Sequence, residues 1–240
     1  MVERDGLENR YTGNSIVGSN PTPSAKMQVK KLHPAFDRLQ KRFGGSSLKP
    51  VYGAGCVKNP KAMLVFMNPT GKNVSAHAGW DGLRAPWLGT KSIWPMFHEL
   101  GYISEKSFGK TQTLKYNEWS AAFAKEIYKE LQRSGIYVTN LAKCTQADAR
   151  HLKDSTFKNY VDLLFREISL ICPQKVIAFG NQVSSIILNK PVSVNRYKGI
   201  QKEVLKIRNK SFNVYPVYYP VGQGRRNMPL AMRRVRKVVK

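Results

Sequence analysis

Acidic residues are scarce in this 240-residue chain. It has 15 Asp and Glu against 40 Lys and Arg, which gives a formal net charge of +25 at pH 7. Like charges repel one another in the compact state, so an excess of this size does not serve folding. It does attract polyanions, because each phosphate that a Lys or Arg neutralises releases condensed counterions. The composition favours nucleic acid as the partner, with a membrane surface, ribosome association and mere solubility as alternatives.

Cysteines and long apolar runs are also scarce. Cys56, Cys144 and Cys172 are too few and too scattered for a disulfide framework, and no Cys-x-x-Cys pair indicates a thiolate metal site. No apolar run is long enough to span a bilayer, and no signal peptide is recognisable. We therefore expect no metal, no membrane partner and a cytoplasmic location, with nucleoid association if the source is a prokaryote.

The first 26 residues differ from the rest of the chain. They carry no periodic apolar pattern and hold three acidic and three basic residues, so the whole net charge lies beyond them. Residues 18–25 can be back-translated into a string that looks like the T-loop and 3′ stem of a tRNA gene. Two interpretations stay open for residues 1–26, a disordered tail or a mis-annotated extension with Met27 as the true start. In both we predict a single domain over residues 27–240.

Beyond Met27 the chain alternates strand and helix signals. Apolar runs of strand length, typical of strands buried on both faces, lie at 62–67, 136–140, 175–179 and 213–218. Helices are expected near 35–43, 92–100, 118–134, 157–171, 181–188 and 229–240, and 204–207 is expected to be an antiparallel or edge element. This order predicts an α/β fold, a three-layer α/β/α sandwich around a short, mainly parallel four-stranded sheet.

In such sheets ligands bind beyond the carboxyl ends of the strands. Three of these ends read Asn68-Pro69, Asn140 and Tyr219-Pro220. Taken alone, each has a plain structural explanation: Asn68-Pro69 as a turn and Asn140 as a cap of the next turn. Together they predict a site at one edge of the sheet.

Five segments resemble motifs of the uracil-DNA glycosylase superfamily, in the same order along the chain. Residues 64–71, LVFMNPTG, resemble the first motif of its single-strand-selective and mismatch-specific branches. Residues 85–89 (APWLG), 136–144 (IYVTNLAKC) and 170–180 (LICPQKVIAFG) look like motifs of its iron–sulfur branch. Residues 218–222, YYPVG, lie where the superfamily has Tyr-His-Pro.

The resemblance implies a monofunctional glycosylase that flips uracil out of single- or double-stranded DNA and hydrolyses its N-glycosidic bond. We expect it to act as a monomer. Asn140 would read the N3–H and O4 of uracil with its carboxamide, and Trp87 would stack on the base or serve as a core aromatic. Asn68, flanked in the pocket by Met67 and Pro69, would position the attacking water.

The segment after the last motif implies a DNA contact. In the superfamily this loop enters the minor groove, where Arg225 or Arg226 would fill the space of the flipped base. The expected DNA-binding residues are Pro220, Gly222, Gly224, Arg225, Arg226 and Asn227. The cations that follow either extend this basic surface or form a solvated helix face; they are Arg233, Arg234, Arg236, Lys237 and Lys240.

The chain departs from the superfamily pattern at three places. Phe66 replaces the first-motif glycine, and Tyr219 replaces the usual histidine, although its hydroxyl can still donate to uracil O2. Of the four cluster cysteines only Cys144, with Cys56 as a weaker match, falls at a corresponding place, and Tyr160 stands near the fourth; no cofactor is therefore expected.

These departures leave three alternatives open. The first is a nucleic-acid-binding protein that kept the fold without catalysis. The second is a glycosylase for another deaminated base such as hypoxanthine, and the third is a basic RNA- or DNA-binding protein unrelated to repair. His77, in the loop before Trp87, is either a substitute acid or base or an exposed loop residue.

Overall fold

The structure, a computed structural model, describes residues 24–148 and 152–240. Most of the expected N-terminal extension, residues 1–23, thus lies outside the described residues. The first helix, α1 (Ala25–Lys30), is capped by the Ser24 hydroxyl, which accepts a hydrogen bond from the Met27 N–H at 3.3 Å. It begins two residues before Met27, and whether the extension is disordered or mis-annotated stays a prediction.

Four parallel strands form the centre of the sheet: β2 (Ala62–Phe66), β3 (Ile136–Asn140), β4 (Val176–Phe179) and β6 (Lys210–Val217). Two antiparallel strands, β1 (Ala54–Gly55) and β5 (Glu203–Ile207), complete the edges in the order β1-β3-β2-β4-β6-β5. The predicted α/β sandwich is confirmed, with six strands rather than four. β5 is the expected edge element, whereas the two-residue β1 is too short to leave a pattern in the sequence.

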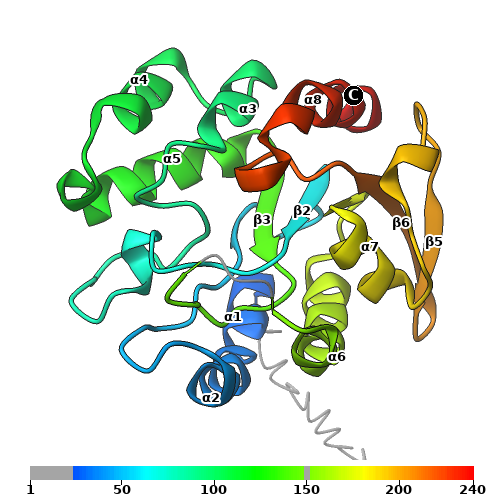
Figure 1. The fold of residues 1–240 in the computed structure, drawn as a ribbon, viewed down its shortest axis with the longest axis horizontal. Helices are drawn as coiled ribbons and strands as arrows, with labels where there is room; N and C mark the ends of the chain where they lie inside the picture. Colours follow the sequence, from blue (N-terminus) through cyan, green and yellow to red (C-terminus); the bar gives the residue numbers. More distant parts are fainter. Residues whose placement is uncertain (1–23, 149–151) are drawn as a thin grey trace, which may run out of the picture.

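Helices cover both faces of the sheet (Figure 1). One face packs against α3 (Trp94–Glu99), α5 (Ala121–Arg133) and α8 (Met228–Val239). The other packs against α1, α2 (His33–Phe43), α6 (Asp154–Ile171) and α7 (Asn181–Leu188). We call these the α5 face and the α6 face. Because successive side chains of a strand point to opposite faces, Leu64 belongs to the first core and Val65 to the second.

Two helix predictions need correction. α3 begins at Trp94 and not at Ser92, because Pro95 at its first turn fixes the start without a side-chain cap. α5 begins at Ala121, where the Ser120 hydroxyl caps it. Trp119 lies just before the helix, yet it is 5% exposed and packs in the same core.

A helix that the sequence did not predict, α4 (Glu105–Thr113), lies beside α3. Its sequence, EKSFGKTQT, has a central glycine and almost no apolar periodicity. Its ends are fixed by polar contacts instead, since Ser104 caps it and Glu130 of α5 accepts hydrogen bonds from the Ser104 and Ser107 hydroxyls. Within residues 24–148 and 152–240, no helix is long and apolar enough to cross a bilayer.

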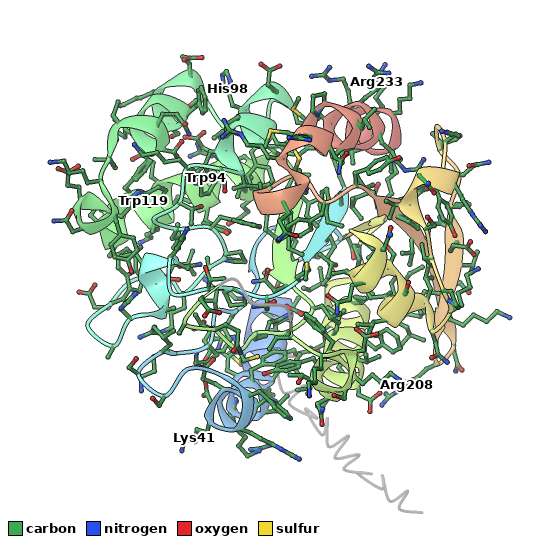
Figure 2. All side chains as sticks on the ribbon, viewed as in Figure 1. Lys41, Trp94, His98, Trp119, Arg208 and Arg233 are labelled. Atoms are coloured by element: carbon green, nitrogen blue, oxygen red, sulfur yellow. The ribbon has the colours of Figure 1, made fainter. Side chains whose placement is uncertain are left out.

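Figure 2 shows how the charged side chains are distributed. Lys41, Arg208 and Arg233 are exposed and point away from the protein, whereas Trp94 and Trp119 lie inside the helical layer. The sequence suggested that Arg234 belongs to an exposed basic face of the last helix, but its side chain is buried, with 6% exposed. It donates hydrogen bonds to the carbonyls of Gly199 and Gln201. Arg234 therefore ties α8 to the segment before β5 and does not contribute to an open basic surface.

The buried side chain of Gln40 connects α2 to the backbone of two loops, and its substitution tests how much this connection stabilises the fold. Its amide donates to the carbonyls of Gly45 and Leu48 at 3.2 and 3.1 Å, and its oxygen accepts from the Thr145 N–H at 2.8 Å. Gln40→Ala should lower the free energy of unfolding by about 1–3 kcal/mol, because buried backbone groups lose their partners. Urea denaturation measures this, with the exposed Gln132→Ala as the control, expected to change it by less than about 0.5 kcal/mol. Equal effects of the two substitutions would contradict the assignment.

Candidate active site

At the carboxyl ends of the parallel strands, Asn140, Trp87 and Tyr219 lie on the α5 face of the sheet. Phe66 and Asn140 are register partners at the ends of β2 and β3, and neighbouring strands lie about 4.8 Å apart. Phe179 ends β4, and Phe66 and Phe179 belong to the core of this face, as does Val138, two residues before Asn140. By strand alternation the Asn140 side chain projects to the same face as Phe66.

The loops that follow β2 and β3 continue to pair after the strands end. The N–H groups of Leu141 and Ala142 donate to the carbonyls of Phe66 and Met67 at 2.7 and 3.0 Å. Further along, the Gln146 N–H donates to the Pro69 carbonyl and the Gly71 N–H to the Gln146 carbonyl. We call these four hydrogen bonds the loop ladder. It fixes the backbone around Asn68 relative to the backbone around Asn140.

An aromatic cluster covers the strand ends. Phe66 is fully buried and stacks on Phe179, with ring centroids 4.4 Å apart and planes 7° from parallel. Trp87 and Tyr219 meet Phe66 edge-on, with centroids at 5.0 and 6.3 Å. Phe66, where the superfamily motif has glycine, is thus the centre of the cluster.

Trp87 carries two unfavourable features. Its backbone is left-handed, with φ +70°, which costs a non-glycine residue about 1–3 kcal/mol. Its buried indole Nε1 has no hydrogen-bond partner among the described residues, whereas the indoles of Trp80 and Trp94 donate to carbonyls. The loop around it is firmly held: the Thr90 N–H and hydroxyl donate to the Trp87 carbonyl at 3.1 and 2.8 Å. Strain that the surroundings enforce is typical of a functional position.

Asn140 is 2% exposed, and its side-chain Nδ2 also has no partner among the described residues. A buried N–H group without an acceptor costs about 1–3 kcal/mol. A turn cap would use the side-chain oxygen as an acceptor, so that role leaves the Nδ2 donor unaccounted for. Two buried donors, on Asn140 and Trp87, therefore lie near Phe66 and find no acceptor in the described part of the chain.

Asn68 follows β2, and Tyr219 of the aromatic cluster follows β6. The Asn68 amide donates one of its two N–H groups to the Pro69 carbonyl at 3.1 Å, and its carbonyl oxygen is an acceptor that it can offer to a ligand. Burial raises the pKa of the Tyr219 hydroxyl well above its usual value, which keeps that hydroxyl protonated and able to donate. Pro69 is buried next to Asn68 in the chain. Met67 is half-buried and packs against the α6-face core, so the structure does not bring this expected pocket residue to the α5 face.

The expected DNA-binding segment forms a short 3₁₀ helix, η4 (Gly222–Asn227), between Tyr219 and α8. Arg225 and Arg226 are exposed, Asn227 is half-buried and Pro220 is buried. Gly222 has φ +59°, a conformation that favours glycine. A Cβ on Gly224 would lie 2.1 Å from the Tyr219 carbonyl oxygen, so this turn packs tightly under the Tyr219 backbone.

The cysteines do not fit a cluster held by four thiolates. The chain has three, of which Cys144 is buried in the α6-face core together with Tyr160. Among the described residues, no three His, Cys, Asp or Glu side chains are grouped so that they could hold a metal ion. Burial raises the pKa of the Cys144 thiol, as expected for a packed core residue.

His77 lies in the loop before Trp87 and is exposed. Its Nε2 is 3.0 Å from the Gly71 carbonyl oxygen, and its ring meets Tyr116 edge-on. A neutral ring with its proton on Nε2 satisfies this contact. These contacts tie His77 to its loop, and its role as an acid or base stays a prediction.

Comparison with known proteins agrees with this geometry. The family model of the uracil DNA glycosylase superfamily matches residues 52–239. The chain belongs to the uracil-DNA glycosylase superfamily. A type-4 uracil-DNA glycosylase from Sulfurisphaera tokodaii is 26% identical over 94 residues, which are 38% of this chain and 42% of that protein. The match therefore spans less than half the length of this curated relative.

Membership of the uracil-DNA glycosylase superfamily confirms the resemblance read from the motifs. Members of the superfamily are N-glycosyl hydrolases. Sequence reasoning missed three side chains at this site: Phe179, Lys143 and Glu167. Phe179 lay in a predicted buried strand, where an aromatic residue is ordinary. Lys143 lay in the matched segment 136–144 but was given no role, and nothing local distinguished Glu167 from the remaining charged residues.

Gly224 gives a test of the turn beneath Tyr219. Gly224→Ala should displace Tyr219 and the exposed Arg225, because the new Cβ would meet backbone and not a movable side chain. DNA affinity, measured by fluorescence anisotropy, should fall about tenfold or more, roughly 1.4 kcal/mol. Gly79→Ala, where a Cβ would enter open space, is the control and should bind as the wild type does. An unchanged affinity for Gly224→Ala would show that the turn does not position the loop.

Proposed function

We propose that the protein is a monofunctional DNA glycosylase that removes uracil from DNA by hydrolysis. The unpartnered Nδ2 of Asn140, buried at the end of β3, is the observation that carries the proposal. Uracil O4 is an acceptor for that donor, and the carboxamide oxygen is an acceptor for uracil N3–H. The type-4 uracil-DNA glycosylase among the relatives supports the same base.

The aromatic cluster supports binding of a flipped base. Once the base is out of the stack, a flat aromatic surface replaces the stacking energy, which is worth about 1–3 kcal/mol per base. Trp87 provides such a ring, and its unpartnered Nε1 offers one further hydrogen bond to an acceptor. In this proposal the energy lost on the two unpaired donors is recovered when the base enters.

In the proposed reaction, water attacks C1′ of the deoxyribose and the bond from C1′ to N1 of uracil breaks. Asn68 would accept a hydrogen bond from the water. An amide is a poor base, so the reaction depends on a dissociative transition state in which uracil leaves as an anion. The protonated Tyr219 hydroxyl would donate to O2 and stabilise the developing charge, in the position of the usual histidine.

A second candidate is a DNA-binding protein of the same fold that does not hydrolyse the bond. Phe66 favours it, because this large ring replaces glycine and contacts Phe179, Trp87 and Tyr219 at once. Binding of a base would then require these rings to move. A third, excision of another deaminated base such as hypoxanthine, uses the same donors and differs only in substrate.

One assay separates these candidates. Purified protein is incubated with labelled single-stranded, U·A and U·G oligonucleotides, and abasic sites are then cleaved with alkali. We expect cleavage of at least one uracil substrate and none of the matched oligonucleotides with thymine. Cleavage of a hypoxanthine oligonucleotide alone would assign the other base, and retention of DNA binding without cleavage would assign the binding protein.

Two substitutions test the assigned roles in that assay. Asn68→Ala should slow uracil excision by about tenfold or more, roughly 1.4 kcal/mol of barrier, because the attacking water loses its acceptor. Asn140→Asp should reduce excision as well, because a carboxylate repels O4 and cannot donate to it. Gln132→Ala, on the outer side of α5, should match the wild type. Full uracil excision by either site variant would refute the role given to that residue.

Trp87→Phe separates stacking from hydrogen bonding. The substitution keeps an aromatic ring and removes the indole N–H, so any loss reports on the hydrogen bond. Excision of uracil should slow by about three- to tenfold, as expected for one neutral hydrogen bond of roughly 1 kcal/mol. Trp80→Phe is the matched control, because the Trp80 N–H already donates to Leu83 in the loop. If both variants excise uracil as fast as the wild type, the Trp87 N–H does not contact the base.

A further inference from the structure

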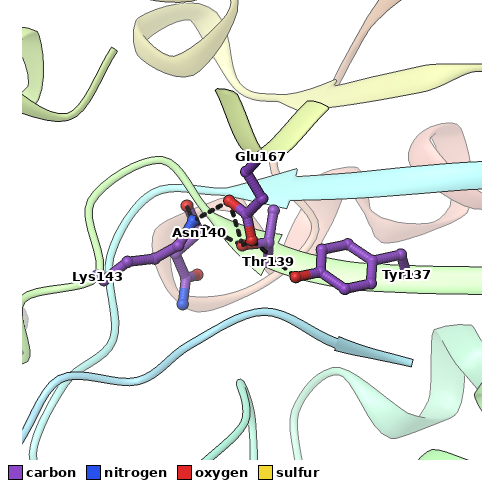
Figure 3. Close-up of polar contacts among 5 residues, drawn as sticks. All are labelled: Tyr137, Thr139, Asn140, Lys143 and Glu167. Carbon is purple, nitrogen blue, oxygen red and sulfur yellow. Dashed lines mark hydrogen bonds and ion pairs between the residues drawn. The ribbon is translucent and has the colours of Figure 1, made fainter. Parts of the chain in front are cut away.

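A fully buried ion pair lies directly behind Asn140, on the α6 face of the sheet (Figure 3). The Lys143 Nζ is 2.7 Å from the Glu167 Oε2, and the two side chains are 0% and 1% exposed. Lys143 follows β3, whereas Glu167 belongs to α6, so the pair connects a strand end to a helix. Neither residue is part of the reaction proposed above.

Both charged groups use their hydrogen-bonding capacity within the protein. The Lys143 ammonium donates to Glu167, to the Thr139 hydroxyl at 2.7 Å and to the backbone carbonyl of Asn140. Glu167 also accepts from the Tyr137 hydroxyl at 2.7 Å and from Thr139. Phe36 lies under the ammonium, with 5.1 Å between Nζ and the ring centroid. The three donors of an ammonium group are therefore all assigned.

Stability does not explain why such a pair is kept. Two charges lose their hydration on burial, and apolar side chains of similar volume often stabilise a core equally well or better. Desolvation lowers the pKa of Lys143, which is the electrostatic sign of that cost. The best supported use of buried ionic groups is to select one geometry among several, so the geometry that this pair selects is the relevant question.

The geometry in question is that of the last residue of β3. Tyr137 and Thr139 point to the α6 face, and the Asn140 side chain points to the opposite face. Lys143 contacts Asn140 only through its backbone carbonyl, from behind. The next residue, Leu141, is held by the loop ladder to the Phe66 carbonyl. The Asn140 peptide is thus fixed from the α6 face and along the sheet, which leaves the carboxamide as its one adjustable part.

We propose that the Lys143–Glu167 pair is a positioning device that aims the Asn140 carboxamide at the flipped base. This inference rests on the proposed function, because it assigns the pair to the same recognition site. The pair does not touch the base. It holds the Asn140 backbone through the Lys143 ammonium group. Because this group is fully buried, water cannot replace its three acceptors.

The test removes both charges together, because either single change would leave an unpaired charge in the core. Lys143→Met with Glu167→Gln keeps side-chain volume and leaves an acceptor for Tyr137 and Thr139. The melting temperature and circular dichroism establish that the double variant is folded. We expect its single-turnover rate of uracil excision to fall about tenfold or more. Its affinity for undamaged DNA should stay within about twofold of wild type, because the basic surface is unaltered.

Coupling to Asn140 distinguishes positioning from general support. In an Asn140→Ala background the pair substitution should cause no further loss of excision, because there is no carboxamide left to aim. The surface pair Lys110–Glu126 is the control. Replacing it by Met and Gln should leave the rate of uracil excision unchanged in both the wild-type and the Asn140→Ala backgrounds. An equal loss in both backgrounds, or no loss in either, would overturn the proposal.

A second readout keeps the inference separate from the proposed function. The Asn140 carboxamide gives an ¹H–¹⁵N pair of NMR signals, assigned by its absence in Asn140→Ala. We expect two distinct signals in the wild type and broadened or shifted ones in the double variant. If the wild type excises no uracil, the proposed function fails, and this spectrum alone decides the inference: unchanged carboxamide signals in the double variant would refute it.

Discussion

The loop ladder is the constraint on which the rest of the site depends. Parallel strands end at the same edge of a sheet, but their loops ordinarily separate there. Here the chains after β2 and β3 stay hydrogen-bonded from Phe66 to Gln146, and Thr70 even pairs with Gln146 as an isolated parallel bridge. Backbone pairing is insensitive to side-chain identity, so it preserves the spacing of Asn68 and Asn140 while the residues around them change. This explains how the chain keeps the architecture of its superfamily although Phe66 and Tyr219 depart from the motifs.

The two faces of the sheet contribute opposite kinds of interaction at the site. On the α5 face, Asn140 and Trp87 leave donors unpaired and Trp87 adopts a strained backbone. On the α6 face, the Lys143–Glu167 pair has every donor assigned. Unpaired donors and strained backbone persist in a folded protein only where many surrounding contacts hold that part of the structure in place. The fully paired network behind the strand supplies such contacts, and strand alternation directs the Asn140 side chain toward the aromatic cluster on the opposite face.

Much of this arrangement could be predicted from the sequence, because it follows from apolar runs. The runs at 62–67 and 136–140 located β2 and β3 and hence placed Asn68 and Asn140 at one edge. Residue contacts that join distant segments could not be predicted in this way. Nothing near Lys143 marks it as the cation that pairs with Glu167, 24 residues along the chain, and Arg234 looks like its exposed neighbour Arg233 until α8 packs on the sheet. The left-handed backbone of Trp87 likewise results from its loop, since tryptophan has no preference for that conformation.

The large positive charge and the neutral site serve different parts of the proposed reaction. The groups proposed to contact the base or the attacking water, two asparagines, a tryptophan and a protonated tyrosine, carry no net charge. Neutral donors can select one base edge by geometry, whereas a cation at the same distance would attract any acceptor. The cations act from farther away, through a field that holds the phosphate backbone and also lowers the energy of a departing base anion. A chain with so few carboxylates keeps this field largely uncompensated, and the buried carboxylate of Glu167, behind the site, is neutralised by Lys143. The ion pair thus has two consequences. Lys143 holds the Asn140 backbone, and it also cancels the charge that Glu167 would otherwise place beside the pocket.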